Sequence, residues 1–475
     1  MHSKAHILVP ERTSVALNDC RLPLPVYAQA PTRTKDDLAI HRLRPHPLLT
    51  TLDLDDGEHV VAFVPSLSQV AVLNQAALAL IQRLPLAEAA EAAEVYGALV
   101  RLVEMGLLVT TDSPALPCPV EPTTLVVWLH LTNACNLRCT YCYIEKNDEA
   151  MSLATAYQAV EASIAAARRH GYRELALKYA GGEPLLAFDT LVATHQYAQE
   201  QCAAAGLGFA ATVLTNGTGL TAPRVARLRA LGLDVTVSLD GAATSNDQQR
   251  PMCNGTGSTA AIMAGLERAR AGGIHPTVAL TITSTSLAGV PALVQWLLER
   301  DLPFTLSFAR DHTCGRSHRD LLADEATLIE GMRTIYATVA ANPPSWSLLG
   351  ALLDRTDLSH AHGQACAAGS HYLVIDHHGR IAACQMVQHM PVADIYHEDP
   401  LGAIRHDERL PLGRHVDTKE GCRTCVWRYW CGGGCPLATL RATGRTDIQS
   451  PDCNIYQALY PDLLRLEGLR LLHQR

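Results

Sequence analysis

Three cysteines lie on one short segment, with the spacing Cys135-x3-Cys139-x2-Cys142. Three thiolates fit an iron–sulfur cluster better than a structural zinc ion, because a structural zinc site is closed by four protein ligands. A four-iron cluster held by three cysteines leaves one iron free to bind a small molecule. The spacing therefore predicts a catalytic iron–sulfur site, and the alternative is half of a zinc site that distant residues complete.

A second group of cysteines lies near the C-terminus: Cys366, Cys384, Cys422, Cys425, Cys431, Cys435 and Cys453. In a reducing compartment such cysteines are metal ligands more often than disulfide partners. Two closed four-iron clusters need eight thiolates, so seven cannot fill both. A pair of zinc sites is the alternative. The isolated cysteines are interpreted as small buried hydrophobic residues: Cys20, Cys118, Cys202, Cys253 and Cys314.

Strand-like and helix-like segments alternate from Thr123 onward and must position these thiols. The pattern predicts strands over residues 124–131, 174–180, 209–214, 234–239, 276–282 and 304–308. It predicts helices over residues 154–170, 191–205, 223–231, 258–271 and 290–299. Successive βα units form a parallel sheet with right-handed crossovers, and their chemistry lies at the carboxyl ends of the strands. We therefore expect an α/β fold with a partial barrel of six βα units.

Polar and glycine-rich motifs follow the first four predicted strands. The first strand leads into the cysteine loop and the second into Gly181-Gly182-Glu183. The third ends before Asn216 and the fourth at Ser238-Leu239-Asp240. Glycines permit close backbone approach, and polar groups at strand ends can hold a charged cofactor.

The segment from Cys135 to Tyr143, CNLRCTYCY, resembles the signature of radical S-adenosylmethionine enzymes. The resemblance implies that the exposed iron binds S-adenosylmethionine and that one electron cleaves it, which yields a 5′-deoxyadenosyl radical. It also implies that Gly181, Gly182 and Glu183 contact the methionine amino group. Asn216, Ser238 and Asp240 would line the nucleoside and methionine side, and Arg250 would face the methionine carboxylate.

The C-terminal cysteines resemble the pattern of the SPASM domain, which holds two auxiliary four-iron clusters. The resemblance implies one cluster on Cys422, Cys425, Cys431 and Cys453, and three ligands to the other from Cys366, Cys384 and Cys435. With the first loop, this makes three 4Fe–4S clusters and S-adenosylmethionine as cofactors. For the fourth ligand we favour an open iron, with His360, His362 or Cys314 as alternatives.

Domain boundaries are expected near residues 40, 115 and 345. Residues 1–40 are interpreted as an extension. Residues 41–115 predict a small winged-helix-like α+β domain, with strands over 48–54, 59–64 and 69–73 and helices over 75–84 and 91–102. The barrel would occupy 116–345 and the SPASM domain 346–475. An exposed strand edge in the winged-helix-like domain could take up an extended peptide.

Charge and hydropathy exclude several classes of protein. The net charge is -8, and acidic residues also outnumber basic ones within residues 1–117, which disfavours nucleic acid as a partner. No apolar run reaches the length of a membrane span, and the first residues lead into no signal peptide. We expect a cytoplasmic protein with neither a membrane nor a nucleic acid as its partner.

Together the three parts resemble radical enzymes that modify peptides. The predicted function is a maturase that crosslinks a ribosomally made peptide or a small protein subunit, most simply by a thioether, with flavodoxin or ferredoxin as electron donor. Alternatives are another crosslink, epimerisation, formylglycine formation as in sulfatase maturases, and, from another class, a zinc scaffold or DNA-binding regulator. Asp311, His312 and Cys314 follow the sixth strand and are candidates for a catalytic acid, base or thiol, unless they are solvated loop residues.

Overall fold

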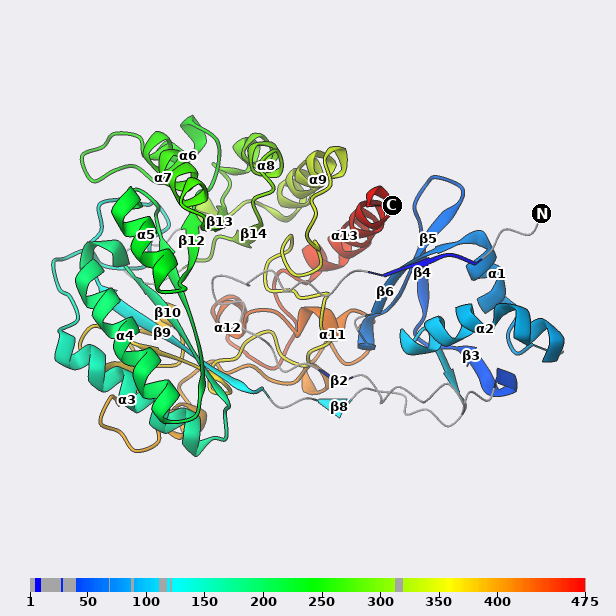
Figure 1. Ribbon diagram of the computed structural model, residues 1–475, viewed down its shortest axis with the longest axis horizontal. Helices are drawn as coiled ribbons and strands as arrows, with labels where there is room; N and C mark the ends of the chain where they lie inside the picture. Colours follow the sequence, from blue (N-terminus) through cyan, green and yellow to red (C-terminus); the bar gives the residue numbers. More distant parts are fainter. Residues whose placement is uncertain are drawn as a thin grey trace.

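The computed structural model describes residues 5–9, 27–28, 40–67, 69–86, 89–110, 118–119, 122–311 and 319–474. Figure 1 shows a layered α/β body at one end, the N-terminal unit at the other, and the last helix of the chain between them. This order in space differs from the order in sequence.

A parallel sheet forms the body of the barrel. Its strands are neighbours in chain order: β9 (Thr124–Thr132), β10 (Glu174–Gly181), β11 (Gly208–Thr215), β12 (Asp234–Ser238), β13 (Thr277–Ile282) and β14 (Phe304–Phe308). Each adjacent pair is parallel. The predicted partial barrel is confirmed.

Helices follow the strands and cover the outer face of this sheet (Figure 1). They are α3 (Leu153–Arg169), α4 (Phe188–Ala204), α5 (Ala222–Ala230), α6 (Thr244–Gln249), α7 (Thr259–Ala271), α8 (Val290–Leu298) and α9 (Glu325–Ala341). Helix α3 begins where the Ser152 side chain accepts a hydrogen bond from the backbone N–H of Thr155 at 3.0 Å. The sequence pattern did not predict α6 and α9.

The barrel sheet continues into the C-terminal region. Strand β15 (Tyr372–Ile375) pairs in parallel with β9, with Tyr372 opposite Val126. Strands β16 (Arg380–Ala382) and β17 (Ala393–Asp394) then extend the same sheet. The sheet therefore crosses residue 345, where the cysteine pattern predicts a domain boundary.

The N-terminal unit contains a four-stranded antiparallel sheet. Its order is β1 (Ile7–Leu8), β6 (Gln69–Asn74), β5 (His59–Val64) and β4 (Thr50–Asp53). Helices α1 (Gln75–Gln82) and α2 (Ala89–Glu104) follow, and two small pairs join β3 (Leu43–Pro45) to β7 (Leu108–Thr110) and β2 (Tyr27–Ala28) to β8 (Cys118–Pro119). Part of the expected extension thus adds strand β1 to the predicted three-stranded sheet.

Both faces of this sheet are buried. On β5, Val60, Ala62 and Val64 belong to the core shared with α1 and α2. Val61 and Phe63 point to the other face and join the core of the barrel and C-terminal region. There Phe63 stacks on Trp427, with ring centroids 5.5 Å apart.

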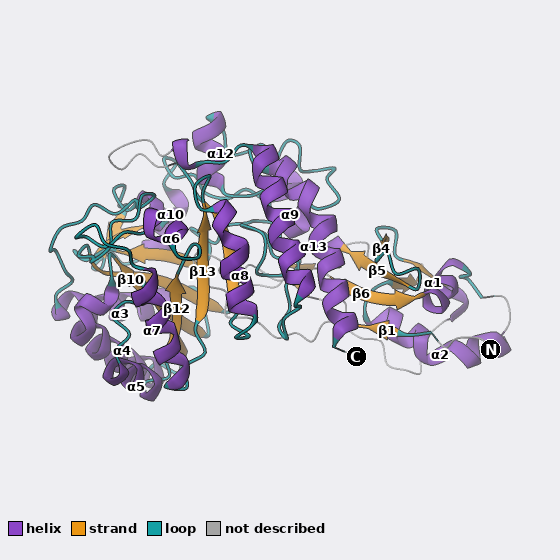
Figure 2. Cartoon of the chain, turned by 90° about the horizontal axis from the view of Figure 1, so that it is seen from above, coloured by secondary structure: helices purple, strands orange, loops and turns teal. Residues whose placement is uncertain are grey.

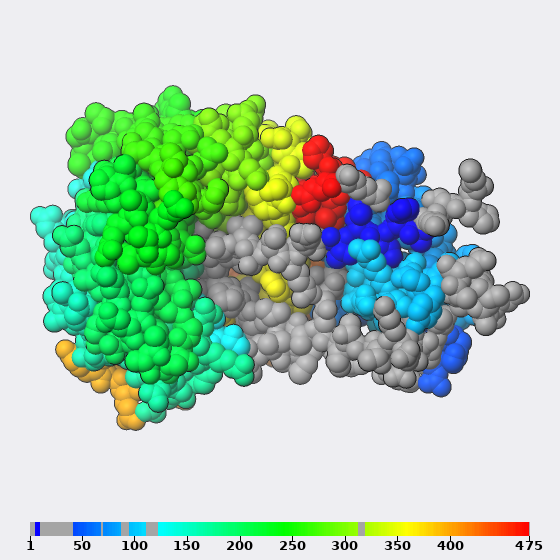
Figure 3. All heavy atoms as spheres, in the orientation of Figure 1, coloured from blue at the N-terminus to red at the C-terminus, as the bar shows by residue number. Residues whose placement is uncertain are grey.

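The long helix α13 (Cys453–His473) fills the space between the barrel and the N-terminal sheet (Figures 1 and 2). It packs against α9 on one side and against β4, β5 and β6 on another. On the face shown in Figure 3, the last residues of the chain lie between the barrel and the N-terminal residues. A Cβ added at Gly468 would lie 2.4 Å from a Val61 methyl carbon, so this close contact requires glycine.

Much of residues 345–452 is irregular. The α-helices there are short: α10 (Pro400–His406), α11 (Arg428–Cys431) and α12 (Pro436–Thr443). Two 3-10 helices, Gln385–Val387 and Val416–Thr418, are the other regular elements besides β15–β17. No helix within the described part of the chain combines the length and the apolar character that a membrane crossing requires.

Candidate functional site

Backbone hydrogen bonds hold the three-cysteine loop at the carboxyl end of β9. Arg138 N–H donates to the Pro251 carbonyl at 2.8 Å, and Thr140 N–H donates to the Gln249 carbonyl at 2.9 Å. The end of β10 packs on the start of the loop, where Gly182 N–H donates to the Thr132 carbonyl at 2.6 Å. A Cβ at Gly182 would lie 2.3 Å from the Ala134 carbonyl oxygen. Glycine is therefore needed for packing against the loop.

The three thiols border a cavity with about 810 Å³ of space not filled by protein atoms, part of it open to solvent. Its walls come from the cysteine loop and from the carboxyl ends of β10, β11 and β12. The residues of the sequence prediction that line it are Cys135, Cys139, Cys142, Gly181, Gly182, Asn216, Ser238 and Arg250. The structure thus brings together predicted residues from five separate segments of the sequence.

Burial shifts two of these thiols toward the protonated form. It raises the pKa of Cys139 to about 12, with the nearby Arg250 charge acting in the opposite direction. Burial also raises the pKa of Cys135, and the nearby Lys146 charge opposes that change. Metal binding requires thiolate, so loading this loop would release protons.

Two of the predicted cofactor-binding residues lie behind the cavity wall. Glu183 is 1% exposed, and its carboxylate accepts hydrogen bonds from Leu185 N–H, Thr215 Oγ1 and Asn216 N–H at 2.7 to 3.0 Å. Asp240 is fully buried and accepts from Tyr141, Gln249 and the Thr281 N–H. Their carboxylates hold the strand ends, and the predicted roles of both residues toward a cofactor stay predictions.

Tyr141 and Lys146 line the cavity as well, although sequence reasoning assigned them no role. The Tyr141 hydroxyl donates to Asp240 at 2.6 Å and accepts a hydrogen bond from Arg250. The Nε of Arg250 is buried and has no hydrogen-bond partner among the described residues. The signal for Tyr141 was its place inside the cysteine motif. Lys146 lies just beyond that motif.

A second cavity, with about 540 Å³ of unfilled space, contains the other three-thiol group. Cys366, Cys384 and Cys435 all line it, together with Arg355 and Gln385. Burial is the main cause that raises the pKa of Cys366, with Cys435 also raising it and Arg355 opposing it. The Cys384 Sγ accepts a hydrogen bond from Met386 N–H at 3.4 Å.

The two histidines considered as a fourth ligand do not line this cavity. His362 is fully buried, and its Nδ1 lies 2.9 Å from the His360 carbonyl oxygen. The His360 Nδ1 lies 3.4 Å from an Asp357 carboxylate oxygen. Within the described residues, the wall of the second cavity therefore has three cysteines and no histidine. Cys314 lies outside the described residues.

The remaining four cysteines form a separate group. Cys422, Cys425 and Cys453 all act electrostatically on Cys431, whose pKa is raised to about 12 chiefly by burial. The Cys431 Sγ accepts from Gly433 N–H at 3.4 Å. The buried Lys419 lies beside this group and donates from Nζ to the Gly433 carbonyl at 2.7 Å. Sequence reasoning did not identify Lys419.

Of the three proposed acid, base or thiol residues, only Asp311 is described. Its carboxylate accepts a hydrogen bond from the exposed Arg319 at 3.2 Å, and it lines neither of the two thiol cavities. His312 and Cys314 lie outside the described residues.

The first cavity has the donor set that an iron–sulfur cluster with an additional bound ligand requires. Three thiols provide the cluster ligands, and the Arg250 side chain adds a positive charge to the wall that would attract an anionic group. Fold and site together define an α/β enzyme that binds its cofactors at the carboxyl ends of a partial barrel.

Comparisons with known proteins agree with this class. Residues 129–290 match the Radical SAM superfamily. The pre-heme d1 synthase of Dinoroseobacter shibae is 31% identical over 373 residues, which cover 71% of this chain and 87% of that enzyme. The serine-type anaerobic sulfatase-maturating enzyme of Klebsiella aerogenes is 24% identical over 382 residues, which cover 74% of this chain and 88% of that enzyme. The solved structure of native anSMEcpe with bound AdoMet has a TM-score of 0.60 at 17% identity, covering 72% of this chain and 99% of that one.

The chain belongs to the radical S-adenosylmethionine superfamily and is a radical enzyme of that family. Membership implies S-adenosylmethionine and one 4Fe–4S cluster as cofactors.

Proposed function

We propose that the chain is a peptide- or protein-modifying radical enzyme with three 4Fe–4S clusters. The observation that carries the proposal is the arrangement of ten cysteines into two three-thiol cavities and one four-thiol group. The first cavity would hold the catalytic cluster on Cys135, Cys139 and Cys142. The four-thiol group would hold a closed auxiliary cluster, and the second three-thiol cavity would hold an open one.

Cluster and S-adenosylmethionine, when bound, supply a 5′-deoxyadenosyl radical that removes a hydrogen atom from the substrate. The residues of the first cavity would bind these cofactors and orient them. Gly181 and Gly182 allow the end of β10 to approach the loop, and the Arg250 guanidinium would hold the methionine carboxylate. Asn216 and Ser238 would face the nucleoside. Glu183 and Asp240 hold the surrounding strand ends from behind.

The second cavity supports a role for a substrate side chain. Its three cysteines leave one ligand position without a described protein donor, and Arg355 adds positive charge at the same wall. A substrate cysteine thiolate would be attracted there by charge and could occupy that position. This arrangement favours thioether formation, in which the thiol gives up its proton on binding and the held sulfur bonds to a carbon that has lost a hydrogen atom. The one electron left over would pass to the auxiliary cluster at this cavity.

The N-terminal sheet offers a place for the rest of the peptide. Strand β1 pairs with β6 only at Val72 and Leu73, so within the described residues Gln69–Ala71 have no strand neighbour on that edge. An extended segment could pair there through its backbone. The Asn74 N–H donates to the His6 carbonyl, so by the alternation of a strand the Val70 N–H also faces this edge. A bound peptide should then protect the Val70 amide from hydrogen exchange.

Replacing Cys135, Cys139 and Cys142 together by alanine tests the catalytic site. We expect no detectable 5′-deoxyadenosine and a fall from about twelve to about eight irons per chain after anaerobic reconstitution. Cys253→Ala is the matched control and should leave both measurements unchanged. The interpretation of Cys253 as a buried residue is wrong, because its side chain is exposed, and it lines neither thiol cavity. Undiminished deoxyadenosine formation by the triple variant would refute the assignment.

Formylglycine formation is the second candidate, because sulfatase-maturating enzymes are among the relatives. The two reactions can be separated by mass spectrometry of peptides encoded beside the gene, after coexpression. A thioether and a formylglycine made from serine both cost the peptide two hydrogens, whereas a formylglycine made from cysteine also exchanges sulfur for oxygen. A thioether leaves no alkylatable cysteine thiol and no aldehyde. A formylglycine would react with a hydrazide probe. No mass change, with an inverted stereocentre, would indicate epimerisation instead.

A further inference from the structure

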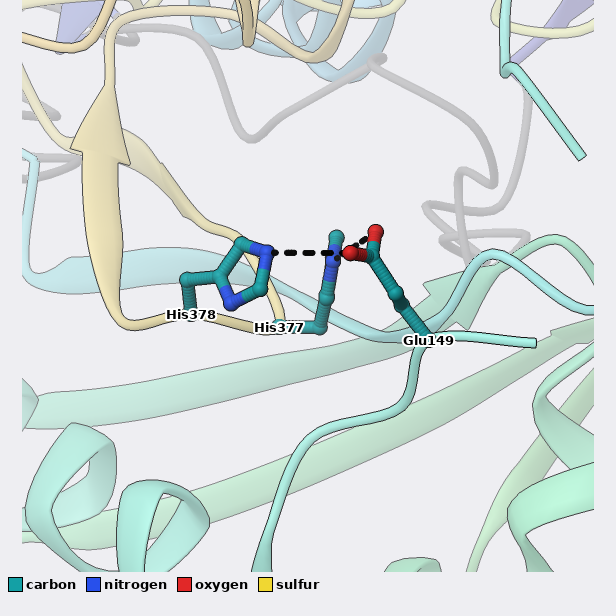
Figure 4. A group of neighbouring side chains, drawn as sticks. All are labelled: Glu149, His377 and His378. Carbon is teal, nitrogen blue, oxygen red and sulfur yellow. Dashed lines mark hydrogen bonds and ion pairs between the residues drawn. The ribbon is translucent and has the colours of Figure 1, made fainter. Parts of the chain in front are cut away.

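A group of potential metal ligands lies outside all three thiol sites. The described residues place Glu149, His377 and His378 together, with one ligand atom from each within 4.8 Å of the others. Figure 4 shows the two imidazoles turned toward the Glu149 carboxylate. Neither cavity described above includes any of these side chains.

The spacing of the ligand atoms is close to that of a tetrahedral ion. His377 Nε2 lies 3.1 Å from Glu149 Oε2, and His378 Nε2 lies 3.8 Å from Glu149 Oε1. In a tetrahedral zinc site with bonds of about 2.0 to 2.1 Å, neighbouring ligand atoms are about 3.3 Å apart. Small side-chain adjustments would therefore be enough to hold an ion.

The surrounding residues hold these ligands in place. The Asp376 carboxylate accepts hydrogen bonds from His378 N–H at 3.0 Å and Arg380 N–H at 2.9 Å, which fixes the turn between β15 and β16. Asn147 Nδ2 donates to Glu149 Oε2 at 2.9 Å. Supporting contacts of this kind commonly orient the ligands of protein metal sites.

His377 is the one buried residue of the three. Its side chain is 6% exposed, and its Nε2 atom lies toward Glu149, whereas its Nδ1 atom is buried without a hydrogen-bond partner among the described residues. A neutral imidazole binds zinc through one nitrogen, so Nε2 would be the ligand atom and Nδ1 would carry the proton.

We propose that Glu149, His377 and His378 bind a divalent transition metal ion, preferably zinc. Two imidazoles and one carboxylate are a donor set suited to zinc, and half-exposed Glu149 and His378 leave the remaining position open to water. The ion would join the segment after the cysteine loop to the β15–β16 turn. It would thereby fasten the catalytic loop to the C-terminal region.

The experiment uses the full chain with its clusters anaerobically reconstituted, so that the cluster cysteines are occupied by iron. Zinc is added, excess is removed, and bound zinc and iron are measured per chain. We expect about one zinc in the wild type, with nitrogen and oxygen neighbours at about 2.0 to 2.2 Å in the zinc X-ray absorption spectrum. Zinc should also slow amide exchange in residues 143–151 and 376–380.

Glu149→Gln and His378→Ala should each lose this zinc while keeping their iron. Both side chains are half-exposed, so these substitutions leave the core intact. His406→Ala is the matched control and should keep the zinc, because His406 is an exposed histidine whose Nδ1 lies 2.7 Å from the Gly402 carbonyl oxygen. Zinc retained in both ligand variants, sulfur neighbours in the spectrum, or no zinc in the wild type would each overturn the proposal.

Discussion

Gly182 shows how a single residue controls the catalytic loop. A methyl group at this position would overlap the Ala134 carbonyl oxygen, and backbone cannot move as a flexible side chain can. We expect Gly182→Ala to displace the cysteine loop and to reduce deoxyadenosine formation at least tenfold, with loss of iron. Gly97→Ala is the control, because no atom lies within 4 Å of a Cβ there, and it should retain activity.

His130 provides a prediction about pH. Burial lowers the pKa of His130 to about 4, although its contact with Asn133 acts in the opposite direction. Its Nε2 lies 2.8 Å from the Asn133 Oδ1, an acceptor, and the Gln388 amide lies 3.4 Å from Nδ1, as a neutral imidazole requires. Between pH 6.5 and pH 4 the unfolded chain takes up a proton at this residue and the folded chain does not. The stability contributed by His130 is therefore present above pH 6.5 and lost as the pH falls.

The His130 effect can be measured by comparing the wild type with His130→Gln. Between pH 7 and pH 5 the wild type should lose about 2 kcal/mol more in free energy of unfolding than the variant. Urea unfolding of both proteins at the two pH values gives this difference. Equal losses would mean that His130 titrates normally in the folded protein.

Strand β5 couples the N-terminal unit to the rest of the protein. Phe63 is 1% exposed and packs on Trp427 and Trp430. Phe63→Ala should lower the free energy of unfolding by about 3 to 5 kcal/mol, because it removes a large buried ring. Hydrogen exchange should become faster in β5, β6 and α13, whereas the sheet from β10 to β14 should keep its protection.

A different distribution of faster hydrogen exchange in Phe63→Ala would contradict the view that Phe63 couples the N-terminal unit to the rest of the protein. If exchange changed only within the core of α1 and α2, Phe63 would not link the two regions. Val64→Ala is a matched control, because Val64 faces that other core. It should affect the N-terminal unit and leave α13 unchanged.

Periodicity in the sequence was sufficient to predict most strands and helices. Strand β5 was predicted with its observed bounds, because its apolar residues lie between a clear turn and a polar segment. Strand β15 was not predicted as part of the barrel sheet. Its pairing with β9 joins residues about 250 positions apart in sequence, and four apolar residues, Tyr372–Ile375, carry no information about their partner.

The candidate sites were likewise predictable where their residues are near in sequence, and not where the fold brings distant residues together. The spacing of Cys135, Cys139 and Cys142 predicted a shared cavity, because ligands on one loop are near in sequence and in space. That Glu183 and Asp240 would lie behind the wall could not be predicted, since it depends on hydrogen bonds from Asn216 and Thr281 on other strands. Lys419 and Arg355 were missed for the same reason.

At the scale of the whole molecule, we expect the binding of a cluster by cysteine thiolates to stabilise the C-terminal region, which has little regular secondary structure. Replacing Cys422, Cys425, Cys431 and Cys453 by serine should make residues 409–452 sensitive to protease, because few helices or strands stabilise them. The barrel up to Ala341 should remain resistant. Limited proteolysis with mass spectrometry tests this, and an unchanged cleavage pattern would show that side-chain packing alone orders the region.

The parallel pairing of β9 with β15 also determines where the chain can be divided. A fragment ending at Ala341 would lack β15, and β9 would become an open edge whose backbone groups can recruit other chains. Such a fragment should aggregate on its own and regain solubility when residues 345–475 are supplied as a separate polypeptide. The two pieces would then behave as complementary halves of one sheet.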